Sequence, residues 1–303
     1  MRAAVPVAAA AALGASPALA HEGHVHCGAL ASWTLDLWVV LPLTATAVLY
    51  GLGVARLWAR FGAGHGVRTW QAGCFAVAWL LLVIGLVSPL HWLGERLFTA
   101  HMIEHEILMA IAAPLLVVAR PLGGMLWALP KPWRSWVGRI GRGPIGRPIW
   151  RRLTEPIYAT ILHGAAIWIW HAPVLYELAL ANAFVHWLQH LSFFFTAILF
   201  WWSLLNGRVR AYGAAVFYLF ATALHSGFLG ILLSLARRPI YPRQTSAAPQ
   251  WGLTQMEDQQ LAGLIMWVPG GLIYAGAALA LAGLWIARSG DNLSAGGPCA
   301  AAR

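Results

Sequence analysis

The feature that most constrains this chain is a series of seven apolar stretches, each long enough to cross a membrane as a helix. A hydrocarbon core about 30 Å thick requires roughly 20 apolar residues in helical conformation. The stretches lie near 33–55, 70–88, 98–119, 155–173, 184–205, 212–235 and 259–287. They predict an all-α, polytopic membrane protein with seven transmembrane helices, in which residues 33–287 form the membrane domain.

The composition argues against other classes of protein. Hydrophobic residues make up 60% of the chain and charged residues only 10%, whereas about a quarter of the residues in a soluble domain are charged. The sequence contains no nucleophile motif and no phosphate-binding glycine loop, so we do not expect an enzyme. The formal net charge of +10 is interpreted as a topology signal and not as a nucleic-acid surface.

The N-terminal segment and the loop charges predict the orientation. Residues 1–20 contain one early arginine, an Ala/Val run and an Ala-Leu-Ala ending, which is typical of a cleaved signal peptide. Cations in the connections divide fifteen to four in favour of an external N-terminus, because cytoplasmic loops collect arginine and lysine. We therefore predict a bacterial-type plasma (inner) membrane protein with residues 288–303 as a cytoplasmic tail. The basic segment 120–154 then becomes a cytoplasmic loop that contacts anionic lipid.

Five histidines are predicted to lie at one depth, in the outer part of the membrane. His101 and His105 are one helical turn apart, and so are His186 and His190, while His171 ends the fourth helix on the same side. Histidine is costly inside a bilayer and requires a partner or a ligand there. The seventh helix brings a carboxylate and a thioether to this layer, from Asp258 and Met266.

These seven side chains predict a metal site. Two imidazoles at positions i and i+4 can reach one ion. Imidazole with a thioether suits copper in either oxidation state, while imidazole with a carboxylate also suits zinc or iron. The alternative for a single pair is hydrogen-bonded packing, and spacing does not select the metal. The predicted ligands are His101, His105, His171, His186, His190, Met266 and Asp258.

Two glutamates flank His105 and are predicted to support the site. At most one of Glu104 and Glu106 can share the histidine face, because neighbours at i+1 and i+2 point elsewhere. They could orient a histidine, bind the metal or relay protons, and a supporting role is favoured. The alternative is a buried, protonated carboxyl or one paired with Arg96.

The predicted mature N-terminus, residues 21–32, is a second candidate for metal binding. It offers His21, His24 and His26 as accessory ligands, next to Cys27. A terminal histidine provides both an amine and an imidazole to Cu(II) or Zn(II). The alternative is a flexible, solvated tail.

The remaining histidines are weaker candidates. His163 and His225 lie deeper, and we interpret them as hydrogen-bonding across the bundle, with a relay or ligand role as the second choice. His65 lies in a glycine-rich cytoplasmic loop and His91 follows Ser88 and Pro89 at the outer surface. Neither of these two is assigned a role.

The site residues stand in ordered motifs that resemble the CtaG-like family of membrane proteins, which assist assembly of caa-type cytochrome c oxidase. The motifs are LFTAHMIEHEILMAIAAPLL at 97–116, WIWHAPVLYELAL at 168–180, HWLQHLSFFFTAILFWW at 186–202, RPIYP at 238–242 and EDQQLAGLIMWVPGG at 257–271. The resemblance implies seven membrane helices and maturation of a haem-copper oxidase, through transient binding of copper and its delivery to an oxidase subunit. The family's motif histidines match the five predicted here, and its carboxylate and Met-Trp-Val-Pro segment match Asp258 and Met266.

Two features depart from the family pattern. Glu104 and Glu106 stand where the family usually carries uncharged residues, and the His-rich segment at 21–27 is not typical of it. These departures leave the identity of the metal and the ligand set open.

Two other functions are alternatives to an assembly factor. A haem-binding membrane redox protein would use one axial histidine from the third helix and one from the fifth. A metal transporter would continue the path inward through His163 and His225, but the inner halves of the helices offer few polar residues. Whether the chain forms a homo-oligomer is left open.

Overall fold

The structure, a computed structural model, describes residues 32–206 and 212–295, which form helices and no strands. The all-α prediction is confirmed for these residues, whereas the predicted signal peptide and the accessory histidines lie outside them. The long helices are α1 (Leu37–Phe61), α2 (Thr69–Leu86), α9 (Pro156–Trp170), α11 (Ala183–Leu205), α12 (Tyr212–Ser234) and α13 (Gln255–Ala295). The shorter ones are α3 (Pro89–Gly94), α4 (Phe98–Glu106), α5 (Ala113–Ala119), α6 (Pro121–Ala128), α7 (Lys131–Arg142), α8 (Gly146–Leu153), α10 (Pro173–Ala181), the π-helix η1 (Ile107–Ala112) and the 3-10 helix η2 (Gln244–Trp251).

Within residues 32–206 and 212–295, six helical segments are long and apolar enough to span a membrane, and the remaining predicted span is a bent pair of helices. The axes of α9 and α10 differ by 73°. Pro173 begins α10, and the residue before a proline is directed away from helical conformation; Ala172 accordingly has an extended ψ of 127°. The described part of the chain therefore contains six candidate spans, or seven if the bent pair counts as one, as expected for a membrane protein.

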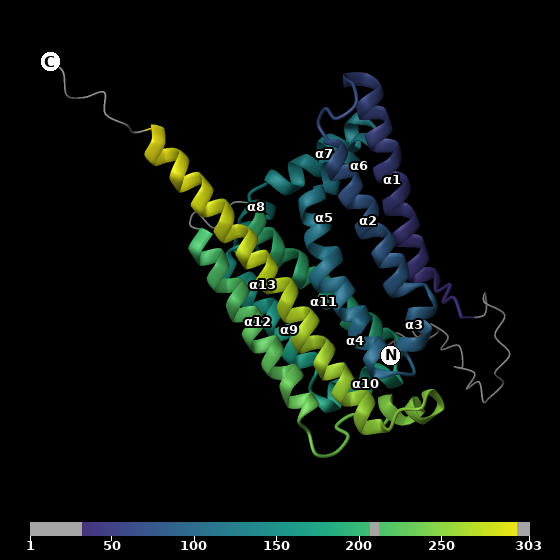
Figure 1. The fold of residues 1–303 in the computed structure, drawn as a ribbon. Coiled ribbons are helices and arrows are strands. Elements are labelled where there is room, and N and C mark those ends of the chain that lie inside the picture. Colours follow the sequence, from purple (N-terminus) through teal and green to yellow (C-terminus); the bar gives the residue numbers. More distant parts are fainter. Residues whose placement is uncertain (1–31, 207–211, 296–303) are drawn as a thin grey trace, which may run out of the picture.

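The two ends of the bundle differ in chemistry (Figure 1). α12 and α13 run side by side along one flank, and α1 and α2 lie on the other. One end, which we call the histidine end, carries α3, α10 and η2. The opposite end, which we call the arginine end, carries α6, α7 and α8, so the basic segment 120–154 is helical and lies far from the histidine end.

The third predicted span changes its winding in the middle. Pro114 has no backbone N–H, and its ring would clash with the carbonyl one turn earlier in a regular helix. The π-helix η1 precedes this proline, and the indole Nε1 of Trp201 donates to the carbonyl oxygen of Met109 within η1 at 2.9 Å. The extra residue of a π-turn changes the helix register, so η1 decides which face α4 presents at the histidine end.

The packing of α12 on α13 depends on a close backbone approach. A Cβ atom on Gly263 would overlap the carbonyl oxygen of Gly230, and one on Gly230 would lie 2.5 Å from the carbonyl oxygen of Gly263. The Ser234 hydroxyl adds a hydrogen bond to the carbonyl oxygen of Gln260 at 3.1 Å. Small residues at a crossing allow membrane helices to pack through their backbones, so this pair positions α13 on the bundle.

Substituting Gly263 with valine is expected to destabilise the bundle, because the new side chain has no space against α12. Overpacking costs about 1–3 kcal/mol of unfolding free energy, which thermal unfolding in detergent would detect as a lower melting temperature. Gly276→Val is the matched control, since a Cβ on Gly276 meets nothing within 4 Å. Equal melting of the two variants would contradict the proposed importance of the crossing.

Candidate metal centre

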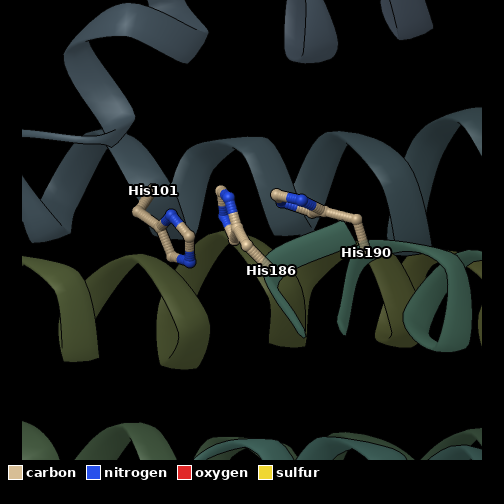
Figure 2. A group of neighbouring side chains, drawn as sticks. All are labelled: His101, His186 and His190. Atoms are coloured by element: carbon tan, nitrogen blue, oxygen red, sulfur yellow. The ribbon is translucent and has the colours of Figure 1, made fainter. Parts of the chain in front are cut away.

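Three histidine side chains from two helices converge at the histidine end. One ring nitrogen from each of His101, His186 and His190 lies within 4.8 Å of the other two. α4 supplies His101 and consecutive turns of α11 supply the other two, with the His186 ring between its neighbours in Figure 2. Metal–nitrogen bonds are about 2.0–2.1 Å long, so small side-chain rotations would allow one ion to contact all three rings.

His105 and His171 extend this group towards the bundle interior. The centroid of the His105 ring lies 4.3 Å from that of His101, 5.1 Å from that of His190 and 6.3 Å from that of His171. His171 follows the last residue of α9, where the chain bends into α10. The structure therefore brings together all five histidines that the sequence analysis selected.

A sixth histidine, His91, belongs to the group although the sequence analysis gave it no role. Its ring centroid lies 6.0 Å from that of His186 and 6.1 Å from that of His190. His91 lies on the short helix α3, which Ser88 caps by accepting a hydrogen bond from the N–H of Leu90. The Ser-Pro start of a helix at the predicted outer boundary was the available sequence signal. We call the six residues His91, His101, His105, His171, His186 and His190 the histidine cluster.

Glu104 is the carboxylate that shares the histidine face of α4. Its Oε1 lies 3.3 Å from Nδ1 of His91 and its Oε2 lies 3.9 Å from Nε2 of His190. The side chain is buried against Gly94, where a Cβ atom would lie 2.5 Å from Oε1. Glu104 thus links α3 to α11 across the cluster, because it follows His101 by three residues on one helix face.

Glu106 points the other way, towards α13. A Cβ atom on Gly270 would lie 2.9 Å from either carboxylate oxygen of Glu106, so this glycine makes room for the carboxyl group. The alternative of pairing with Arg96 is wrong for both glutamates. Nη1 of Arg96 lies 3.5 Å from Oε2 of Glu95, and Cζ of Arg96 lies 4.1 Å from the centre of the Trp92 ring.

The electrostatics at the mouth of the cluster favour a charged imidazole. Burial lowers the pKa of His91, but the nearby acidic groups of Glu104, Glu95 and Asp36 together raise it by more, so the pKa lies above the usual histidine value. The His91 side chain is 12% exposed and Glu104 only 1%. His91 thus combines access from the end of the bundle with a carboxylate partner, and His190, which is 10% exposed and 3.9 Å from the same carboxylate, does so to a lesser degree.

Many polar atoms of the cluster are buried without a hydrogen-bond partner. They include one ring nitrogen each of His101, His171, His186 and His190, both of His105, and both oxygens of Glu104. Nδ1 of His171 lies 2.7 Å from the carbonyl oxygen of Ile167, so it carries the proton and Nε2 presents a lone pair. Buried polar groups almost always have partners, and this arrangement of imidazole nitrogens fits a bound metal ion.

Two predicted ligands have other positions. Both carboxylate oxygens of Asp258 accept a backbone N–H at 2.9 Å, one from Phe98 and one from Thr99, and the Thr99 hydroxyl donates at 2.7 Å. The prediction of Asp258 as a ligand is corrected, because its carboxylate caps the start of α4. Met266 is buried in the apolar core, with its Cβ near Gly230, and its role as a ligand stays a prediction.

The deeper histidines lie apart from the cluster. Nδ1 of His163 lies 3.2 Å from the hydroxyl of Thr196 on α11, which agrees with the predicted hydrogen bond across the bundle. Nε2 of His225 lies 3.2 Å from the position of a Cβ atom on Gly164. These contacts give both rings a place in the packing of α9, α11 and α12.

Among curated proteins, the chain is similar to several of mycobacterial origin. An uncharacterized protein of Mycobacterium leprae (strain TN) is 26% identical over 242 residues, covering 74% of this chain and 35% of that protein. Uncharacterized proteins of Mycobacterium bovis and Mycobacterium tuberculosis are 25% identical over 255 residues, covering 78% of this chain and 37% of theirs. The chain thus spans about a third of the length of the curated relatives it matches. No solved structure matches it.

Family membership follows from a match to a family model. The sequence model for the cytochrome c oxidase caa3 assembly factors covers residues 48–288, which include every residue of the histidine cluster. The chain therefore belongs to the cytochrome c oxidase caa3 assembly factor (Caa3_CtaG) family.

Proposed function

We propose that this protein binds copper in the histidine cluster and delivers it to a subunit of the oxidase during assembly. The observation that carries the proposal is the set of buried imidazole nitrogens without partners, contributed by α3, α4, α11 and His171, the residue that follows α9. The role is that of a metal carrier and not of a catalyst. Copper is the cargo, so the site must release it as well as bind it.

The chemistry of the donors supports copper. Imidazole binds copper and zinc well, whereas a structural zinc site commonly uses thiolates. Cys74, the cysteine within the described ranges, packs in a separate apolar cluster with Tyr50 and Phe75. An oxidase whose active site contains haem and copper needs a copper donor, and this need selects copper over zinc for a member of this family.

The packing of the rings favours an ion over a haem. The His101 and His186 rings stack at a centroid distance of 5.5 Å, and His190 lies 4.5 Å from His186. A haem requires a flat slot between its axial ligands, and rings in direct contact leave no such slot. The haem-binding alternative would need the two helices to separate.

The position of the cluster supports transfer at one membrane face. The histidine end lies opposite the basic helices α7 and α8 (Figure 1). If the arginine end is cytoplasmic, as the distribution of cations predicts, the cluster opens to the outer side. The oxidase subunit would then dock against α3, α10 and η2.

Metal analysis of the full chain purified in detergent tests the proposal, together with an optical spectrum. Near-stoichiometric copper, and its loss to an oxidase copper-site peptide added in excess, are expected. A haem Soret band would instead favour the redox alternative. A copper-free protein that still restores oxidase activity to a deletion strain would contradict copper delivery.

Replacing Glu104 with glutamine is expected to weaken copper binding roughly 10–100-fold, as for other groups that orient metal ligands. Glutamine keeps the shape of the side chain but replaces one of the two oxygens that face His91 and His190 with an NH2 group. Competition titration with a chromophoric copper chelator would measure the affinity.

Glu106→Gln is the matched control for this experiment. It removes a buried carboxylate from the same helix, but from the face that packs on Gly270 of α13. Its copper affinity should equal that of the wild type. Equal effects of the two variants would show that Glu104 has no special relation to the cluster.

A further inference from the structure

We propose that the histidine cluster holds two copper ions, and that His105 and His171 bind the second one as copper(I). This inference rests on the proposed copper function and adds a separate binding subsite to it. The first ion occupies the convergent group of His101, His186 and His190.

The number of unsatisfied donors is the first argument. A single copper ion commonly takes three or four donor atoms, and the first group already provides three imidazole nitrogens. Both ring nitrogens of His105 and Nε2 of His171 then remain buried without a hydrogen-bond partner. Buried polar groups almost always have a partner, so these nitrogens point to a second ligand in this part of the cluster.

The geometry of this pair is the second argument. The ring centroids of His105 and His171 are 6.3 Å apart, with the ring planes at 79°. Two imidazoles on opposite sides of one ion, with metal–nitrogen bonds of about 2 Å, place their centroids roughly 6 Å apart. The pair thus has the spacing of a nearly linear, two-coordinate site.

His171 is held in the orientation that such a site needs. Its Nδ1 is 2.7 Å from the Ile167 carbonyl oxygen, and its own carbonyl accepts a hydrogen bond from the Tyr241 hydroxyl at 2.6 Å. Nε2 is consequently the free donor. A hydrogen bond on the second ring nitrogen is the usual support of a metal-bound histidine.

An apolar ring beside the pair selects the oxidation state. The Phe193 ring lies 4.7 Å from His105 and 6.0 Å from His171, measured between centroids. It restricts the approach of water and of further ligands to this side of the pair. Copper(I), with its filled d shell, accepts two imidazoles in a linear arrangement, whereas copper(II) and zinc require more donors.

Copper content after anaerobic loading with copper(I) tests the inference on the full chain in detergent. The wild type should retain about two ions per chain and His171→Gln about one, since His105 alone provides one donor to the second ion, too few to hold it. His163→Gln, which removes a buried histidine from α9, the helix that ends just before His171, should retain as much as the wild type. Copper X-ray absorption should show a two-coordinate component in the wild type and its loss in His171→Gln.

The outcomes separate the two proposals. About one ion in both the wild type and His171→Gln would overturn the second subsite and leave copper binding intact. A wild type that retains no copper would overturn both. If His171→Gln does not fold, the copper content and absorption spectrum of the wild type decide, and a wild type without the two-coordinate component refutes the inference.

Discussion

Replacing both His101 and His105 with alanine is expected to abolish retention of copper and, in cells, to reduce oxidase activity to that of a deletion strain. The double variant removes one ligand of the convergent group and one histidine that touches both His190 and His171. The loss of a ligand from a three-imidazole site costs most of its affinity. Metal analysis of purified protein and oxidase assays of membranes would measure the two effects.

The bundle is expected to remain folded in this variant. Ring nitrogens of His101 and His105 are buried without a hydrogen-bond partner, which costs free energy in the folded state. Removing the two rings removes this cost, and the gain offsets part of the packing energy that is lost with them. The control is His163→Ala/His225→Ala, which removes two imidazoles from the neighbouring helices α9 and α12. Retention of copper and oxidase activity there is expected, and loss of delivery with copper still bound would favour the transporter alternative.

Replacing Asp258 with alanine is expected to have the largest effect on stability. α4 begins after Leu97, which has no side-chain oxygen to cap the helix. Asp258 from α13 takes over this task and accepts the N–H groups of Phe98 and Thr99. Each buried N–H left without an acceptor costs about 1–3 kcal/mol, so the free energy of unfolding should fall by roughly 2–6 kcal/mol for the two.

The consequence should extend to copper, because His101 lies in the first turn of α4. A frayed first turn would move its ring away from α11, so copper retention should fall together with the melting temperature. Asp258→Asn keeps one carbonyl acceptor and should lie between the wild type and Asp258→Ala. Gln260→Ala, an exposed substitution on the same helix, should leave both measurements unchanged. If copper retention were lost in Asp258→Ala without any loss of stability, Asp258 would have to be reconsidered as a ligand.

The local features of the sequence were sufficient to predict the membrane helices and the layer of histidines. Hydropathy over about 20 residues identifies a membrane helix because each apolar side chain contributes independently of its neighbours. The i, i+4 spacing places His101 beside His105 and His186 beside His190, because helix geometry is the same in every fold. The equal depth of these pairs follows from the same counting along each helix. Details of winding, such as the π-helix before Pro114, were not predicted.

Tertiary structure alone decided which polar groups share the site. Asp258 and His91 lie at the same predicted depth, yet Asp258 caps α4 and His91 joins the cluster. Met266 faces the packed core near Gly230, although its position along the chain allowed a ligand. The depth of a residue in the membrane follows from its position along its helix, which can be counted from the sequence. The rotation of each helix and its neighbours depend on contacts between distant segments, such as Gly94 against Glu104 and Gly230 against Gly263, which no local pattern encodes.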